Sequence, residues 1–257
     1  MKQPPESADV FIDVILDAAS EAQPANLLDI RIGPFWTVVH TSIGTGMASI
    51  LRSESHLHGT QPIADAGRLD ERSPLELAAL MRSESVLEAA IGLAAANALL
   101  VSTVKGLTEE KAVSILRERG AGKRVAMIGH FPFADELRES CDELLIFERG
   151  PGRRDGDLGD EAIDQLIPDA DVVAVTATTL LNRTLPGVLA GVRDDAFVML
   201  LGPSTPLTPA LHRFGFDVLC GTVIDDPVGV VRAVEQGAVT RQIKGVRRVC
   251  LWRETRN

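Results

Sequence analysis

Five apolar runs in the second half of this chain constrain its fold more than any other feature of the sequence. They cover residues 124–128, 143–147, 171–175, 196–201 and 217–220. Helix-compatible stretches separate each run from the next. Strands of this kind are buried on both faces, as in a parallel sheet between two layers of helices. The pattern therefore predicts an α/β fold.

Each run ends in a small, polar or glycine-rich corner, and we expect function at these corners. Ligands of open parallel sheets bind beyond the carboxyl ends of the strands. The corners cover residues 129–133, 148–152, 176–179, 202–206 and 221–226. The corners and the residues just after them supply these candidate ligand-binding residues: Gly129, His130, Phe131, Glu148, Thr176, Thr178, Asn182, Gly202, Ser204, Thr205 and Asp225.

The first half of the chain is organised differently. Apolar residues at helical spacing behind a Ser7 cap predict a helix over residues 7–22. Three extended segments joined by glycine-containing turns predict an antiparallel meander over residues 27–32, 36–41 and 47–52. Further helices are predicted over residues 74–82, 86–101 and 109–119. We therefore expect a smaller α+β domain over residues 1–105, followed by the sheet domain over residues 106–257.

Composition and charge narrow the partners of the protein. The 257 residues carry a formal net charge of -10, which argues against nucleic acid because phosphate binding requires clustered Lys and Arg. The longest apolar stretch, residues 89–101, is shorter than the roughly 20 residues of a membrane span. Nothing in residues 1–7 resembles a signal peptide. We expect a cytoplasmic protein that binds a small molecule or a metal and not a membrane; self-association into a homo-oligomer stays open.

The three cysteines show no metal-binding or redox spacing. Cys141, Cys220 and Cys250 are far apart in the sequence and form no Cys-x-x-Cys pair. We therefore expect reduced, mostly buried thiols.

Several stretches of the chain resemble a known family. They are residues 33–39 (GPFWTVV), 94–99 (AAANAL), 129–132 (GHFP), 176–185 (TATTLLNRTL) and 202–206 (GPSTP). In this order they resemble the bacterial and archaeal family named for putative heavy-metal chelation. The resemblance implies an enolase amino-terminal-like α+β domain joined to a Rossmann-like domain. It also implies that a metal or a small ligand binds in the cleft between the two domains.

The corner after the first run offers a glycine and an imidazole. Gly129 allows close backbone approach to an anion, but the Gly-x-Gly-x-x-Gly fingerprint of dinucleotide sites is absent. Phe131 and Phe133 would otherwise pack under the sheet in a tight turn. His130 is either a ligand or proton carrier facing the cleft, or a structural imidazole held by hydrogen bonds.

Glu148 ends the second run at the position of a ribose-binding carboxylate. It lies 19 residues after Gly129, near the offset of about 20 residues found in Rossmann-type sheets. A carboxylate there would suit an adenosine ligand such as S-adenosylmethionine or NAD. The alternative is a surface pair with Arg149. The glycine-rich residues 150–159 that follow are either a mobile flap or an exposed loop.

The third corner is richer in hydroxyl and amide groups than one helix cap requires. Thr176, Thr178 and Thr179 precede Asn182 and Thr184. Capping uses only one such group, which favours a ligand-facing role for Thr178 and Asn182.

The last two corners have both structural and functional interpretations. Two prolines stiffen residues 202–206, so Ser204 and Thr205 either hold an anion or cap a helix over residues 209–214. Asp226 precedes Pro227 as a helix cap would, which leaves Asp225 free to face the cleft.

The metal hypothesis depends on one histidine pair. His56 and His58 are two residues apart, so both rings can face one ion on an extended segment. An exposed loop is the other interpretation of this pair. Soft metals prefer thiolate and imidazole ligands, and the cysteines do not supply them.

Three classes of function stay open at this point. The first is a protein that binds a metal or a small metal–ligand complex between its domains. The second is an enzyme that uses S-adenosylmethionine or another adenosine cofactor, and the third is a non-catalytic interaction module. No spacing identifies a nucleophile with its base or an acid–base dyad, which favours binding over hydrolysis but leaves alkyl transfer open.

Overall fold

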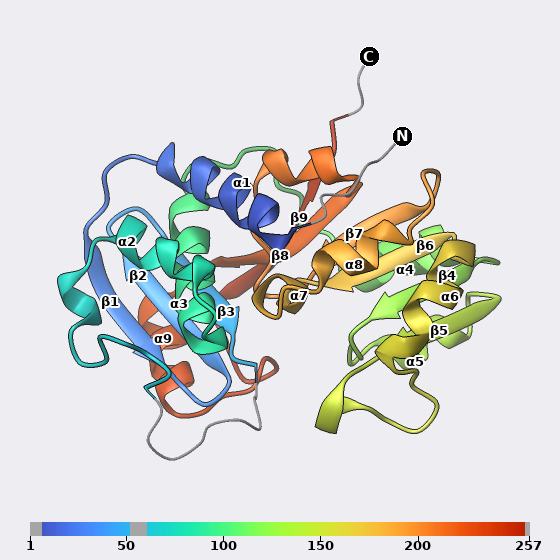
Figure 1. Cartoon of the computed structure of the whole chain (residues 1–257). Coiled ribbons are helices and arrows are strands. Elements are labelled where there is room, and N and C mark those ends of the chain that lie inside the picture. Colours follow the sequence, from blue (N-terminus) through green and yellow to red (C-terminus); the bar gives the residue numbers. More distant parts are fainter. Residues whose placement is uncertain (1–6, 52–60, 255–257) are drawn as a thin grey trace.

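The computed structural model describes residues 7–51 and 61–254. Within this part of the chain, six strands form a large sheet in the order β5-β4-β6-β7-β8-β9 (Figure 1). The strands are β4 (Arg124–Ile128), β5 (Glu143–Phe147), β6 (Val172–Thr176), β7 (Phe197–Leu201), β8 (Val218–Ile224) and β9 (Val246–Trp252). The first five run parallel and correspond to the five predicted runs, while β9 pairs antiparallel with β8. The α/β fold is thus confirmed, and β9 is an addition that the sequence analysis missed.

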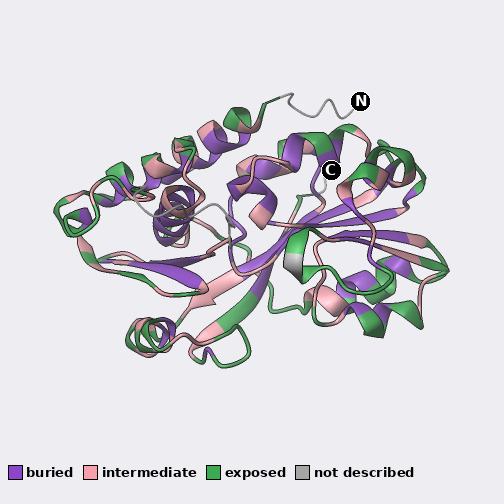
Figure 2. Cartoon of the chain, turned by 60° about the horizontal axis from the view of Figure 1, so that its bottom comes forward, coloured by how far each residue is buried: buried purple, intermediate pink, exposed green. Residues whose placement is uncertain are grey.

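Helices cover both faces of the large sheet. The alternating side chains of β4 divide between two apolar clusters: Val125 and Met127 face one way, Ala126 and Ile128 the other. On the first face lie α4 (Ala112–Gly120) and α5 (Ala134–Arg138). The second face is covered by α6 (Ile163–Leu166), α7 (Thr178–Leu181) and α8 (Leu185–Ala190). The central strands β4, β6 and β7 are accordingly buried along most of their length (Figure 2).

The order of the strands determines where a ligand can enter. The chain leaves β4 for β5 on one side and then crosses back to β6 on the other side of β4. The loops after β4 and β6 therefore diverge, which opens a crevice at the carboxyl ends of these strands.

The first half of the chain forms a separate small sheet with helices. Its strands are β1 (Leu27–Ile32), β2 (Trp36–Thr41) and β3 (Thr45–Ser49), antiparallel in sequence order. Its helices are α1 (Ala8–Ser20), α2 (Pro74–Ala78) and α3 (Val86–Leu100). Short 3-10 segments complete the described elements: Leu69–Glu71, Ala79–Arg82, Gly150–Gly152, Asp160–Ala162, Ile167–Asp169 and Pro209–Phe214. The meander and its helices were predicted, but β3 starts two residues earlier than expected because Thr41 and Gly44 close a short turn.

The two halves share their packing. Helix α9 (Pro227–Glu235) comes from the second half, yet Val230 and Val234 pack on Trp36 and Met47 of the small sheet. On the other face of that sheet, α1 and α3 belong to one apolar cluster with strands of the large sheet. The small sheet therefore lies between helices of both halves.

The structure corrects the prediction of reduced cysteines. Cys220 on β8 and Cys250 on β9 are directly opposite each other and form a disulfide. The prediction failed because β9 was missed, so nothing in the sequence placed Cys250 beside Cys220. Cys141 is a free thiol, and burial raises its pKa.

α3 packs so closely on the preceding helical turns that there is no room for a side chain at Gly92. A Cβ at this position would collide with the backbone nitrogen of Met81. We expect Gly92→Ala to lower the free energy of unfolding by about 1–3 kcal/mol, the usual cost of overpacking. Gly187→Ala in α8 is the matched control, because its Cβ would meet nothing within 4 Å. Equal midpoints for both variants in urea denaturation would contradict this packing.

Candidate functional site

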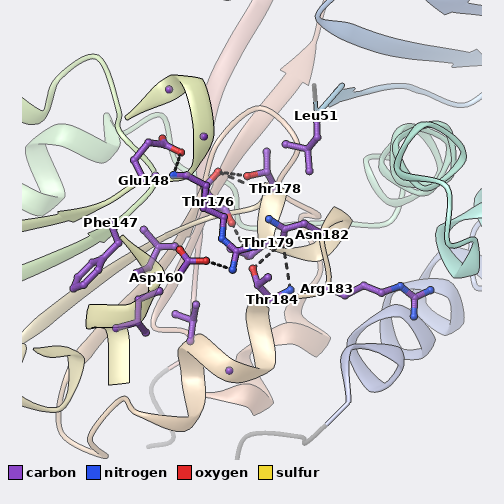
Figure 3. Close-up of a pocket in the computed structure, with 18 of the residues that line it drawn as sticks. Leu51, Phe147, Glu148, Asp160, Thr176, Thr178, Thr179, Asn182, Arg183 and Thr184 are labelled. Atoms are coloured by element: carbon purple, nitrogen blue, oxygen red, sulfur yellow. Dashed lines mark hydrogen bonds and ion pairs between the residues drawn. The ribbon is translucent and has the colours of Figure 1, made fainter. Parts of the chain in front are cut away.

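A cavity that both halves of the chain line lies at the crevice between β4 and β6. It has a volume of about 760 Å³ and opens beyond the carboxyl ends of β4, β5 and β6 (Figure 3). Its lining consists of Leu51, Val86, Ile128, Gly129, Phe147, Glu148, Arg149, Gly150, Gly152, Asp160, Ile163, Asp164, Thr176, Thr178, Thr179, Asn182, Arg183, Thr184, Gly187 and Val188. Leu51 and Val86 belong to the first half of the chain, and the other lining residues to the second. Five of the predicted site residues meet in this cavity: Gly129, Glu148, Thr176, Thr178 and Asn182.

Gly129 permits the close approach of the two corners. It has a φ of 100°, and a Cβ there would lie 3.2 Å from Cβ of Thr176 at the end of β6. Its N–H donates to the carbonyl of Phe147 at 2.8 Å. Any larger residue would therefore strain the backbone and push the ends of β4 and β6 apart.

Glu148 joins the corners after β4 and β5. One carboxylate oxygen accepts the His130 N–H at 2.7 Å, and the other accepts the Arg149 N–H at 2.8 Å. The carboxylate thus uses a backbone donor that an anion would otherwise bind at this corner. Each oxygen keeps a second acceptor position, so Glu148 can still accept hydrogen bonds from a ligand in the cavity.

The corner after β6 presents hydroxyl and amide groups to the cavity. The hydroxyls of Thr176 and Thr178 lie 3.0 Å apart, and Thr179 donates to the Thr176 carbonyl at 2.7 Å. The side-chain oxygen of Asn182 accepts the Thr184 hydroxyl at 2.7 Å, which fixes the amide plane. Within the described part of the chain, the side-chain nitrogen Nδ2 of Asn182 makes no hydrogen bond, so it is available to a ligand.

Arg183 holds this corner against the first half of the chain. Its φ of 59° is the only positive value at a described non-glycine residue. The guanidinium donates to Asp9 at 2.9 Å and to the Arg82 carbonyl at 2.7 Å. Such a conformation persists only where the surroundings enforce it, and it is common at ligand sites.

The charge of the cavity is negative on balance. Glu148, Asp160 and Asp164 line it together with Arg149 and Arg183. Arg149 is ion-paired with Asp160, and Arg183 with Asp9. Since neither arginine is unpaired, the electrostatics favour a neutral or positively charged ligand over a phosphate.

His130 makes a side-chain hydrogen bond of the kind that one of its two predicted interpretations requires. Its Nδ1 lies 2.9 Å from Asp157, and both side chains are almost fully buried. It is not among the residues that line the cavity. Phe131 stacks on Phe133 with ring centroids 5.4 Å apart, in agreement with packing inside a tight turn.

Asp157 also anchors the loop that follows β5. Burial on its own raises the pKa of a carboxyl group, but hydrogen bonds from the Arg154 N–H and the His130 ring hold the pKa of Asp157 below its ordinary 3.8. Leu158 then pairs with Phe147 at the end of β5. The glycine-rich segment is therefore anchored at its second end by a buried carboxylate.

Residues 202–206 lie between the two sheets and not at the large cavity. The Ser204 hydroxyl accepts the Ser49 N–H at 2.8 Å, and Asn97 donates to the carbonyls of Met47 and Ser204 at 3.1 Å each. Ser204 and Thr205 are buried. Neither caps residues 209–214, because Thr208 does so. Ser204 thus joins the halves of the protein, while the Gly202 N–H donates to Cys220 within the second half.

Asp225 is not free, contrary to the prediction. It forms a two-point ion pair with Arg247 at 2.7 and 3.0 Å. The strand β8 extends to Ile224, so Asp225 follows it at the turn into α9 and away from the large cavity. Asp226 caps α9 as predicted, accepting the Gly229 N–H at 3.0 Å.

The predicted metal ligands His56 and His58 lie outside the described residues. Within the described ranges, no group of three or more His, Cys, Asp or Glu side chains is arranged to hold a metal ion. The same ranges contain no helix with the length and apolar character needed to cross a bilayer.

Among the polar lining residues that the sequence analysis did not predict as ligand-facing groups are Asp160, Asp164, Arg183 and Thr184. The first two follow the loop after β5 and enter the cavity only because Asp157 anchors that loop. Arg183 and Thr184 lie within residues 176–185, one of the stretches that resemble the family. The turn between α7 and α8 was the feature from which their position at the cavity could have been predicted.

Comparison with known proteins establishes the family. Residues 15–100 and 111–253 match two sequence families, DUF4213 and DUF364, which both carry the description "putative heavy-metal chelation". The chain belongs to this family. An uncharacterized protein of Methanocaldococcus jannaschii is 30% identical over 186 residues, which are 70% of each chain.

Solved structures of the same family share the fold. A protein of unknown function from Desulfitobacterium hafniense has a TM-score of 0.81 at 24% identity, over 95% of this chain and 98% of its own. A second, from Pyrococcus horikoshii, has a TM-score of 0.78 at 20% identity, over 94% of this chain and 99% of its own.

The buried carboxylate of Asp157 makes stability depend on pH. Folding lowers the pKa of Asp157, so its carboxylate stabilises the fold fully at any pH above the pKa of the unfolded chain. This stabilisation is lost as the pH falls through the pKa of the folded protein, which lies below 3.8. We expect Asp157→Asn to lower the free energy of unfolding by about 2 kcal/mol at neutral pH. This difference from wild type should shrink as the pH falls below 3.8. The neighbouring, exposed Asp155→Asn is the control. Urea denaturation from neutral to acid pH measures both, and a gap that widens in acid would contradict the assignment.

Proposed function

We propose that the protein binds a small polar organic molecule, neutral or positively charged, in the cavity at the ends of β4, β5 and β6. The observation that carries this proposal is the cavity of about 760 Å³ at the crossover of the sheet, where open α/β sheets bind their ligands. Its volume is typical of sites for small molecules. Thr178, Asn182 and Glu148 supply hydroxyl, amide and carboxylate groups that orient such a ligand.

The net negative charge of the cavity lining supports a ligand that is neutral or positively charged. A phosphate would face Glu148, Asp160 and Asp164 without an unpaired cation from the protein. The backbone donor after β4 is already bound to Glu148. A hydroxyl or amine of a ligand, in contrast, can donate to these carboxylates.

A metal would enter this site as a complex with the organic ligand. The described residues offer no cluster of three protein ligands, and those of them that line the cavity include no cysteine or histidine. Carboxylates and hydroxyls alone are poor partners for a soft metal ion. The family name is therefore compatible with a protein that recognises a chelating molecule.

The position of Glu148 favours an adenosine cofactor as the second candidate. The carboxylate follows β5 and keeps acceptor positions for the two hydroxyls of a ribose. S-adenosylmethionine fits the electrostatic argument better than NAD, because it carries a sulfonium cation and no pyrophosphate.

A ligand screen tests the proposed class. In thermal-shift assays of a metabolite library, we expect neutral or cationic hits to raise the melting temperature by about 5–10 °C at 100 times Kd. Gly187→Phe, which projects into the cavity from a position with open space, should abolish the shift. A set of hits that consists of phosphorylated anions, or that acts equally on this variant, would contradict the proposal.

Calorimetric titration tests the adenosine candidate. Glu148→Ala should weaken the binding of S-adenosylmethionine at least about tenfold, because the ribose loses its acceptor. Glu118→Ala, an exposed carboxylate on α4, is the control. Equal affinity of wild type and Glu148→Ala would remove the ribose-binding role.

Elemental analysis tests direct metal binding by the histidine pair. If His56 and His58 hold a metal, the purified protein contains a stoichiometric transition metal that is lost in His56→Ala and His58→Ala. A metal-free protein that still binds its organic ligand would end that reading and agree with the proposal above.

A further inference from the structure

A second cavity, separate from the first, lies beside β8 and β9. Its volume is about 420 Å³, and it shares no lining residue with the larger cavity. The walls come from both halves of the chain: Met47 of β3, Pro203 after β7, Thr222 of β8 and the segment before α4. No residue predicted as a ligand contact lines it.

Four exposed basic side chains line this cavity. They are Lys111, Arg241, Lys244 and Arg248. Within the described part of the chain, none of them has an ion-pair or hydrogen-bond partner for its side chain. Most other described arginines are paired, as Arg31 is with Glu235 and Arg193 with Asp171. A concentration of unpaired cations in a protein with a net charge of -10 marks a site for negative charge.

Two carboxylates at the same cavity do not neutralise these cations. Glu109 is engaged by Arg247 at 2.9 Å, and Arg247 is not part of the lining. Glu110 accepts the Thr108 hydroxyl at 2.6 Å and the indole N–H of Trp252 at 2.8 Å. Both carboxylates are therefore bound to donors other than the four cations, and the cavity keeps an excess of positive charge.

The start of α4 adds backbone donors to the same place. Lys111 stands at the cap position of this helix and provides no side-chain hydrogen bond to its first turn. The first amides of α4 thus lie next to a residue that lines the cavity. These amides would donate hydrogen bonds to a bound anion, and the positive end of the helix dipole would stabilise its charge. Without an anion, the positive charge of Lys111 at this end of the helix is unfavourable.

We propose that this second cavity binds a small anion with two or more negative charges, such as a phosphate ester, a diphosphate or a polycarboxylate. Arginine matches both carboxylate and phosphate oxygens in two-point contacts, and lysine adds point charges. The two cavities would then differ in preference: the first takes neutral or cationic groups, the second takes multiply charged anions. The assignment does not depend on the function proposed for the first cavity.

Calorimetry with pyrophosphate and with citrate tests the assignment and separates the two chemical sources. We expect at least one of these anions to bind the wild-type protein, with an affinity that falls between about 50 and 300 mM NaCl, as screening of the cations requires. Arg241→Ala/Lys244→Ala should weaken binding about tenfold or more. Both side chains are exposed, so the fold should survive their removal, as circular dichroism can verify.

The control is Lys123→Ala/Arg232→Ala, which removes the same charge from exposed positions outside the cavity. It should bind the anion like wild type. Binding of pyrophosphate alone assigns the site to phosphate compounds, and binding of citrate alone assigns it to polycarboxylates. Failure of both anions to bind, or equal weakening by the two double variants, would overturn the proposal.

Discussion

The position of β4 between β5 and β6 is the constraint on which the rest of this structure depends. Because the chain leaves β4 to one side and returns to the other, the loops after β4 and β6 separate and leave a cavity between them. Gly129 lets the two strand ends approach closely, and Glu148 ties the neighbouring corner to the end of β5. The polar groups of Thr178 and Asn182 then face a space that the fold itself creates. A different strand order would distribute the same residues over separate edges of the sheet.

The two halves of the chain are held together by buried and ion-paired contacts that complete this cavity. Asn97 of α3 donates to carbonyls in both halves, and Ser204 bonds to Ser49. Arg183, in an unfavourable backbone conformation, reaches Asp9 across the same boundary. Helix α9 in turn covers the small sheet. The wall that Leu51 and Val86 contribute is therefore fixed relative to the strand ends, and a ligand in the cavity would contact a preformed surface.

The sequence was informative where local patterns decide the structure. The five apolar runs, the meander and the caps at Ser7 and Asp226 were predictable because periodicity and capping chemistry are local. Long-range partners were not. β9 has charged residues at its exposed end, and it is a strand because it pairs with β8. The disulfide between Cys220 and Cys250 depends on this pairing and could not be predicted either. For the same reason His130 kept two interpretations and Asp225 was wrongly predicted to be free: Asp157 and Arg247, which pair with them, lie 27 and 22 residues away.

The most direct measurement of the central claim is native mass spectrometry of the freshly isolated protein. The account predicts an adduct with the mass of a small organic molecule, with or without a coordinated metal, that is displaced without unfolding and absent after Gly187→Phe. A bare metal ion retained on the protein, or an adduct that persists unchanged in that variant, would contradict a ligand site at the ends of β4, β5 and β6.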